Sequence, residues 1–161
     1  MMRRMLGMMM TALLLSGSVF AACGTEPLAH EEAFRLSAVP LDDRSVEVRM
    51  AIEPCYYLYQ DKLKFSLTPA EMGKVAMPVG TLKQDPYFGQ VSVYYGKVSV
   101  VLPFSSQPKG ASITLKTEYQ GCAEAIGLCY PVSAQMLTFT VPKSAVPGEE
   151  IFAREPKKRW F

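Results

Sequence analysis

Apolar and polar residues alternate in short runs between residues 34 and 141. The clearest run is Ser45–Ile52, in which every second residue is apolar, and the same alternation marks residues 111–119 and 136–141. A repeat of two residues is typical of a half-buried strand. Turn signals recur about every ten residues and no long helical pattern interrupts them. The pattern therefore predicts an all-β, antiparallel sandwich.

Two hairpins are expected within this pattern. Residues 90–95 and 97–104 flank Tyr95-Gly96 and are predicted to pair around it. Residues 111–119 and 136–141 are predicted to pair as well, with Cys122 and Cys129 at the base of the loop between them. Antiparallel pairing can bring two cysteines within the short Cα separation that a disulfide needs. The hairpin that carries Cys122 and Cys129 is therefore the leading candidate for a functional site.

The N-terminus has the pattern of an export signal. Residues 1–22 combine a basic start at Arg3-Arg4 with an apolar run that is too short to span a bilayer. Residues 20–23 resemble a bacterial lipobox, which makes Cys23 a candidate for lipidation. The alternative is cleavage by a general signal peptidase after Ala21 or Ala22. Either route predicts export to an oxidising compartment.

The rest of the chain is expected to form one domain with two polar flanks. We predict a tether at 23–33 that contains a solvated His30, a domain at 34–141 and a C-terminal tail at 142–161. Without Arg3 and Arg4 the chain has 15 basic and 15 acidic residues. A neutral protein has no electrostatic footprint for nucleic acid or for an anionic membrane. Membrane contact is therefore expected only through an N-terminal lipid anchor.

Export changes the interpretation of the four cysteines. Cys122 and Cys129 are expected to pair, while Cys55 is left over. The simplest role of the pair is a staple, worth about 2–3 kcal/mol for so short a loop. The alternative is thiol–disulfide exchange, which needs an accessible sulfur. Copper(I) binding with Cys55 is a third hypothesis, but the spacing of the cysteines is not that of a zinc site. We expect no metal and no cofactor.

Two aromatic segments accompany the cysteines. In an extended Tyr56-Tyr57-Leu58-Tyr59 segment, Tyr57 and Tyr59 share one face and the other two residues share the opposite face. The second segment places two large aromatic residues in a turn, where small polar residues are usual. It consists of Asp85, Pro86, Tyr87, Phe88 and Gly89. This turn either covers a reactive site or tucks its aromatic rings into the core.

Three motifs, in the same order, resemble the periplasmic N-terminal domain of the thiol:disulfide interchange protein DsbD. The segment 119–131 resembles the active-site hairpin of that family, 56–59 its tyrosine strand and 85–89 its cap loop. The resemblance covers residues 34–141. It implies an immunoglobulin-like β-sandwich with a cap loop over a cysteine pair.

The resemblance also implies residue roles. Cys122 and Cys129 would be catalytic, with Cys129 attacking the disulfide of a partner and Cys122 resolving the mixed disulfide. Asp85 would raise the pKa of a thiol through its negative charge. The residues expected to line the site are Tyr57, Tyr59, Tyr130 and Pro131.

The expected partners are thioredoxin-fold periplasmic proteins that isomerise disulfides or reduce apocytochrome c. We expect a monomeric, periplasmic oxidoreductase component that reduces protein disulfides. No transmembrane region or thioredoxin-like domain follows Val141, so the electron donor is expected to be a separate membrane protein. The alternative function is a non-redox structural or binding lipoprotein domain in which Cys122–Cys129 only stabilises the fold.

The chain departs from the family pattern at three places. The loop between Cys122 and Cys129 is one residue longer than is usual in the family. Pro86 stands where an acidic residue is frequent, and Cys55 stands where glycine is frequent. A longer loop is expected to change the disulfide geometry, and a third thiol is expected to interfere with or regulate the pair.

Overall fold

The computed structural model describes residues 23–143 and 148–153. The signal peptide and lipobox predicted before Cys23, and the end of the tail after residue 153, lie outside these described residues. Within them, no helix is long and apolar enough to cross a membrane.

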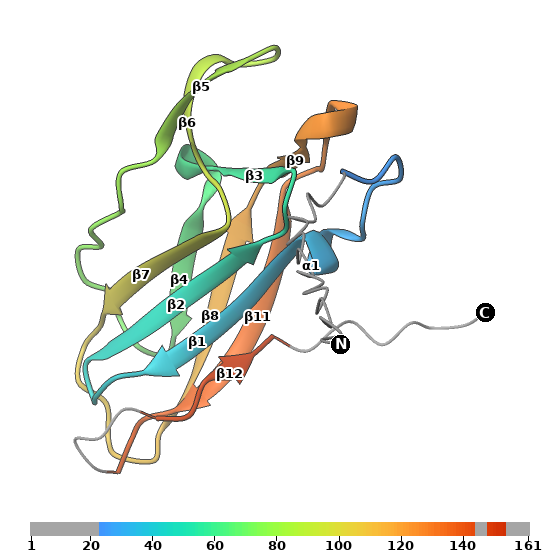
Figure 1. Ribbon diagram of the computed structural model, residues 1–161. Coiled ribbons are helices and arrows are strands. Elements are labelled where there is room, and N and C mark those ends of the chain that lie inside the picture. Colours follow the sequence, from blue (N-terminus) through green and yellow to red (C-terminus); the bar gives the residue numbers. More distant parts are fainter. Residues whose placement is uncertain (1–22, 144–147, 154–161) are drawn as a thin grey trace, which may run out of the picture.

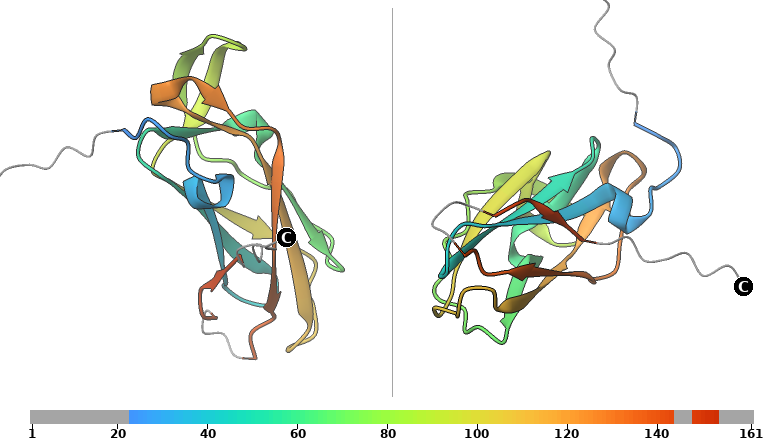
Figure 2. Two further views of the ribbon diagram at one scale, coloured as in Figure 1. Left: turned by 90° about the vertical axis from the view of Figure 1, so that its right-hand side faces the viewer. Right: turned by 90° about the horizontal axis from the view of Figure 1, so that it is seen from below.

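Two antiparallel sheets form the layers of a sandwich, and a third sheet lies at one end of it (Figure 1). The first layer, in spatial order, is β12 (Ile151–Phe152), β1 (Phe34–Pro40), β2 (Ser45–Ile52) and β7 (Lys97–Pro103). The second layer is β11 (Ser133–Thr140), β8 (Ser112–Tyr119) and β4 (Lys64–Thr68). Figure 2 shows these layers from two further directions.

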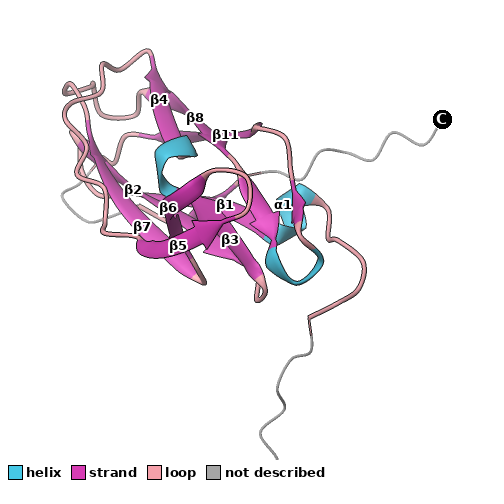
Figure 3. Ribbon diagram, turned by 90° about the horizontal axis from the view of Figure 1, so that it is seen from above, coloured by secondary structure: helices cyan, strands magenta, loops and turns pink. Residues whose placement is uncertain are grey.

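The third sheet carries the two aromatic segments and both cysteines of the hairpin. Its strands, in spatial order, are β10 (Leu128–Cys129), β9 (Gly121–Ala123), β3 (Tyr56–Tyr59), β6 (Gly89–Tyr94) and β5 (Thr81–Asp85). Short helices complete the fold: α1 (His30–Ala33), η1 (Gln60–Lys62) and η2 (Glu124–Ile126). Figure 3 looks down on this end of the sandwich.

The alternating runs form the core as predicted. Every second residue of β2 is buried, and β8 buries Ile113, Leu115, Thr117 and Tyr119 in the same way. Full burial of one such large apolar side chain contributes roughly 1.5–3 kcal/mol. The predicted all-β sandwich is therefore confirmed.

The hairpin predicted around Tyr95-Gly96 is wrong. β6 pairs with β3 and β5, whereas β7 pairs with β2, so the chain passes from one sheet to another at this corner. Gly96 has a φ of +64°, which only glycine adopts at little cost, and its carbonyl accepts the Ile52 N–H. β6 instead forms a hairpin with β5, and residues 85–89 make its turn.

The hairpin that holds the cysteines is confirmed. β8 and β11 pair along their whole length, from Ser112 opposite Thr140 to Tyr119 opposite Ser133. Cys122 and Cys129 follow as opposed residues of β9 and β10.

The flanks are more ordered than the sequence pattern suggested. The segment predicted to be a tether includes α1, and His30 Nδ1 lies 3.2 Å from the Tyr119 hydroxyl, so this histidine is not simply solvated. The predicted tail contributes β12, which pairs with β1. Cys55, predicted to be left over, forms a disulfide with Cys23. Each correction depends on a contact between residues far apart in the chain, which local polarity does not reveal.

A candidate redox site at the cysteine pair

The structure joins Cys122 and Cys129 in a disulfide across β9 and β10, with 4.0 Å between their Cα atoms. Cys122 is 1% exposed because β9 also pairs with β3, whereas Cys129 is only half-buried in the edge strand β10. Exchange requires that an attacking or attacked sulfur be reachable. Cys129 is therefore the more accessible cysteine of the pair, and Cys122 lies behind it.

The loop between the cysteines has its own conformation. It forms the single turn η2 and ends at Gly127, whose φ of +63° closes the turn. Leu128, which is 41% exposed, lines a hollow together with Cys129, and Ile126 in the same loop is 39% exposed. The loop therefore places an exposed apolar side chain next to the more accessible sulfur.

Two tyrosines form a wall behind the sulfurs. The Tyr59 hydroxyl oxygen lies 3.3 Å from Cys122 Sγ and 3.7 Å from Cys129 Sγ. Tyr57 and Tyr59 pack with Val93 and Cys122 in a small cluster, separate from the main core that holds Tyr56 and Leu58. The two predicted faces of the tyrosine strand are confirmed.

Asp85 organises this wall from beneath the cap loop. Its carboxylate is 2% exposed and accepts hydrogen bonds from the hydroxyls of Tyr57 at 2.8 Å and Tyr59 at 2.7 Å. It also accepts the backbone N–H groups of Tyr87 at 2.8 Å and Phe88 at 3.0 Å. Burial acts to raise the pKa of Asp85, but these four hydrogen bonds outweigh it and lower the pKa below its ordinary 3.8.

The same contacts raise the pKa values of the tyrosines. Burial, together with the hydrogen bond to Asp85, raises the pKa of Tyr59 to about 12 and raises that of Tyr57 further. Both hydroxyls therefore stay protonated at neutral pH and act as hydrogen-bond donors to Asp85.

The cap loop, residues 85–89, lies against the disulfide with its aromatic rings outside the main core. Phe88 packs edge-on against Tyr59 with ring centroids 5.3 Å apart, and the Tyr87 hydroxyl is 3.4 Å from the carbonyl oxygen of Gly127. Tyr87 is nevertheless 66% exposed and Phe88 51%. A hollow of about 390 Å³ is lined by Tyr87, Phe88, Gln120, Gly127, Leu128 and Cys129. The geometry is that of a cover over the site.

The hairpin of β5 and β6, here called the cap hairpin, has a second attachment that is not evident from the sequence. Lys83 in β5 forms an ion pair with Glu124 in η2, and its ammonium lies 4.9 Å from the centroid of the Tyr57 ring. The hydrogen bond to Glu124 raises the pKa of Lys83. Tyr95 also contacts Glu124 through its hydroxyl, at 3.4 Å. The partners are far apart in the chain, so no local motif indicates them.

Tyr130 and Pro131 were expected to line the site of the cysteine pair, but the structure places them elsewhere. The Tyr130 ring packs against Phe34 and Tyr56, with centroids 5.8 Å and 6.4 Å away, and its hydroxyl donates to the Leu28 carbonyl at 2.6 Å. Pro131 is exposed. Tyr130 therefore supports the back of the hairpin, on the side opposite the wall of Tyr57 and Tyr59.

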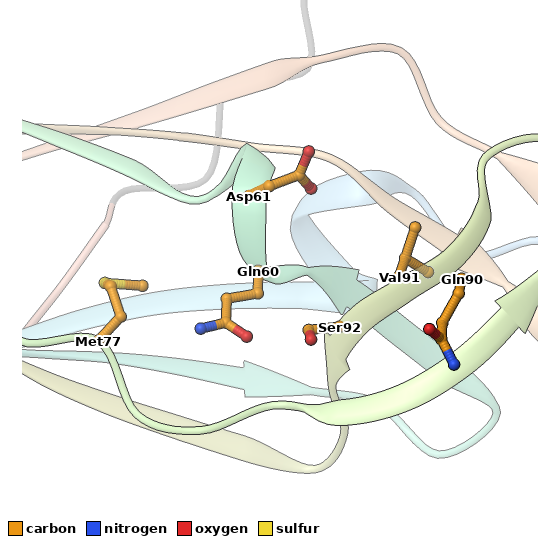
Figure 4. A pocket seen from close by; sticks show the side chains of 6 residues that line it. All are labelled: Gln60, Asp61, Met77, Gln90, Val91 and Ser92. Carbon is orange, nitrogen blue, oxygen red and sulfur yellow. The ribbon is translucent and has the colours of Figure 1, made fainter.

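A second hollow, of about 590 Å³, lies beside β6 (Figure 4). It is lined by Gln60, Asp61, Met77, Gln90, Val91 and Ser92. No thiol reaches it, so it offers nothing for disulfide chemistry. The copper hypothesis loses its third ligand, because Cys55 is bonded to Cys23. The described part of the chain contains no cluster of three or more His, Cys, Asp or Glu residues suited to a metal.

An Asp85→Asn substitution is expected to loosen the cap loop in a pH-dependent way. Hydrogen bonds to a charged group are worth about 1.5–3 kcal/mol, so the variant should lose about 2 kcal/mol of unfolding free energy at neutral pH. A lowered folded-state pKa gives stability that is complete above pH 3.8 and disappears as the pH falls through that lowered value. Denaturant unfolding of both proteins at several pH values measures the difference.

The control is Asp61→Asn, the same change at an exposed carboxylate. It should alter the unfolding free energy by no more than about 0.5 kcal/mol. An Asp85→Asn difference that stays constant down to pH 2 would contradict an ionised Asp85 as the acceptor of the four hydrogen bonds.

Comparison with known proteins agrees with this geometry. A family model described as "Thiol:disulfide interchange protein DsbD, N-terminal" matches residues 24–141. DsbD 2 of Pseudomonas aeruginosa is 38% identical over 133 residues, which cover 81% of this chain and 21% of that protein. DsbD of Neisseria meningitidis is 35% identical over 131 residues, with the same coverage. The chain thus spans about a fifth of the length of these relatives.

Solved structures show the same fold. The reduced N-terminal domain of Neisseria meningitidis DsbD matches with a TM-score of 0.67 and 29% identity, over 79% of this chain and 95% of that one. A complex of the DsbD and PilB N-terminal domains from that organism matches with a TM-score of 0.59 and 31% identity, over 78% of this chain and 100% of the matched one. The predicted immunoglobulin-like sandwich is confirmed. The chain belongs to the family of DsbD N-terminal domains.

Proposed function

We propose that this protein is an exported thiol–disulfide exchange module that relays electrons through Cys122 and Cys129. The observation that carries the proposal is a disulfide with one buried and one reachable sulfur beneath a cover that is only partly packed. Family membership supports it, because the relatives are named thiol:disulfide interchange proteins. The electron donor is a membrane reductase, and the acceptors are thioredoxin-fold proteins. The complex of the Neisseria DsbD N-terminal domain with the PilB N-terminal domain supports docking to another protein domain.

The exchange consists of a reduction by the donor, followed by a reduction of the acceptor that takes two thiolate attacks. A dithiol of the donor reduces Cys122–Cys129 and is itself oxidised to a disulfide. The Cys129 thiolate then attacks the disulfide of an acceptor and releases one acceptor thiolate. The Cys122 thiolate attacks Cys129 in the mixed disulfide, which restores the Cys122–Cys129 bond and leaves the acceptor as a dithiol.

The tyrosine wall accounts for control of this chemistry. In the reduced domain a Cys122 thiol can donate to the Tyr59 oxygen 3.3 Å away, while the Tyr59 hydroxyl donates to Asp85. Hydrogen bonding of the protonated thiol, together with the nearby carboxylate, disfavours the thiolate. An acceptor that displaces Tyr87 and Phe88 would uncover Cys129 and disturb this arrangement, which restricts exchange to proteins that fit the site.

The proposal places the protein in the periplasm as a monomer. The export signal expected at residues 1–22 and the two disulfides both suit an oxidising compartment. The apolar side chains around Cys129 serve as the docking surface for one acceptor at a time.

A glutathione redox titration tests the proposal. Thiol alkylation followed by peptide mass would quantify Cys122 and Cys129 separately from Cys23 and Cys55 in the same sample. We expect the Cys122–Cys129 couple between about −180 and −270 mV, the range of thioredoxin-family couples. A value below about −300 mV, typical of structural disulfides, would favour the alternative, a binding domain stapled by this bond.

A further inference from the structure

The second disulfide, Cys23–Cys55, ends beside the redox site. Cys55 directly precedes β3 and has a φ of +70°, the only positive φ of a residue other than glycine in the described ranges. This left-handed conformation costs such a residue roughly 1–2 kcal/mol, whereas glycine adopts it freely. A cysteine at this position indicates that its side chain, not only its backbone, is needed there.

The backbone of Cys55 supports the loop between the catalytic cysteines. Its carbonyl oxygen accepts the N–H of Glu124, the first residue of η2, at 2.8 Å. The next residue, Tyr56, pairs with Ala123 in β9. Movement at Cys55 is therefore transmitted directly to the residues that follow Cys122.

Cys23 brings the N-terminal segment to the same place. Residues 24–29, here called the strap, run from Cys23 to α1 beside the hairpin of β9 and β10 (Figure 1). The Leu28 N–H donates to the Tyr56 hydroxyl at 2.9 Å, and the Leu28 carbonyl accepts the Tyr130 hydroxyl at 2.6 Å. Tyr56 lies in β3, which pairs with β9, and Tyr130 directly follows Cys129, so the strap contacts residues that adjoin both strands of the reactive pair.

We propose that Cys23–Cys55 is a positioning disulfide, which fastens the strap to the redox site and thereby sets the reactivity of Cys122–Cys129. The proposed effect on the reactivity of Cys122–Cys129 rests on the proposed function, whereas the existence of the Cys23–Cys55 bond does not depend on it. With the strap fastened, β9 and β10 hold their two thiols at a high effective concentration, which favours the oxidised pair. Release of the strap would free Tyr130 and η2 to move and would weaken that preference.

The Cys23–Cys55 bond also determines whether Cys23 can be lipidated. Its formation removes two electrons and two protons from the two thiols, and a protein disulfide of an oxidising thioredoxin-fold protein accepts them and becomes a dithiol. A sulfur in this bond cannot carry a thioether-linked lipid. The mature chain would therefore keep Cys23 as a disulfide partner and have no lipid there.

Intact and peptide mass of the non-reduced mature protein, isolated from periplasmic and membrane fractions of an expressing bacterium, tests the bond. The expected result is a peptide that links Cys23 to Cys55 and a mass without acyl chains. A diacylglyceryl group on Cys23 with a free Cys55 thiol would overturn the proposal, and so would two free thiols.

Two matched variants test the positioning role. Cys55→Gly removes the disulfide and suits the positive φ, whereas Cys23→Ala removes the disulfide and leaves the strained Cys55. Both should lower the equilibrium constant for oxidation of Cys122–Cys129 by glutathione at least about threefold, and both should speed alkylation of the reduced Cys129. Hydrogen exchange at the Glu124 amide should rise in both.

A stapling role alone would lower the melting temperature and leave the equilibrium constant of the pair unchanged, and this result would overturn the inference. The test compares the oxidation equilibrium constant of Cys122–Cys129 in the variants with that in the natural protein. It is therefore informative whatever the reduction potential of the natural pair is. A reduction potential of the natural Cys122–Cys129 pair in the range of structural disulfides would contradict the proposed function. An equilibrium constant that is the same in the variants and in the natural protein would contradict only the positioning role.

Discussion

A reduced Cys122→Ser variant should accumulate a stable mixed disulfide with an oxidised thioredoxin-fold protein, and a reduced Cys129→Ser variant should not. The half-buried Cys129 sulfur is the more accessible one, whereas Cys122 is 1% exposed; the proposed mechanism therefore gives Cys122 the resolving step. Turnover in both variants should fall by roughly 10³-fold or more, because members of one covalent catalytic unit fail together. Non-reducing electrophoresis and peptide mass would identify the trapped species.

The Cys122→Ser/Cys129→Ser double variant is the control for adducts formed through Cys23 or Cys55, and it should form none. Trapping by Cys129→Ser in the absence of trapping by Cys122→Ser would reverse the two assigned roles. Trapping by neither variant, with a partner that the natural protein reduces, would place the chemistry elsewhere.

A Gly121→Ala substitution should destabilise the domain by about 3 kcal/mol or more, at the upper end of the range for overpacking. The added Cβ would lie 2.6 Å from the Tyr57 carbonyl oxygen and closer still to the buried Phe34 ring. The carbonyl belongs to the β3–β9 ladder and cannot rotate away, so the strands themselves must separate. The melting temperature should fall by roughly 10 °C.

Gly127→Ala is the matched control, in the same hairpin. Its Cβ would meet nothing within 4 Å, and only its φ of +63° opposes the change, at a cost of about 1–2 kcal/mol. Equal losses of melting temperature in the two variants would show that backbone conformation, not the close approach of Phe34 and Tyr57, explains the glycine at 121.

Much of the fold follows from local pattern. The alternation of β2 and β8 determines which side chains are buried, and the same period assigns the two faces of Tyr56–Tyr59. Cys122 and Cys129 could be placed opposite one another because the hairpin that carries them is local in sequence. In these cases the information lies within one strand or between neighbouring strands.

The errors arose where distant segments meet. The runs that became β6 and β7 look like a hairpin because they are adjacent, but the chain turns at Gly96, and the two strands pair with partners in different sheets. Lys83 and Glu124 are joined only because the cap hairpin folds over η2. The role of Cys55 requires that residues near Cys23 return to β3. Composition and periodicity contain no record of such long-range pairings.

The separate packing of Tyr57, Tyr59, Val93 and Cys122 has a consequence for how this domain could be altered. The buried side chains of the sandwich and those behind the cysteines form two separate clusters, and β3 contributes to both. Substitutions that adapt the cap hairpin to a new acceptor need not disturb β1, β2, β7, β8 and β11. A scaffold of this kind can therefore acquire a different docking surface by changes confined to one end of the molecule.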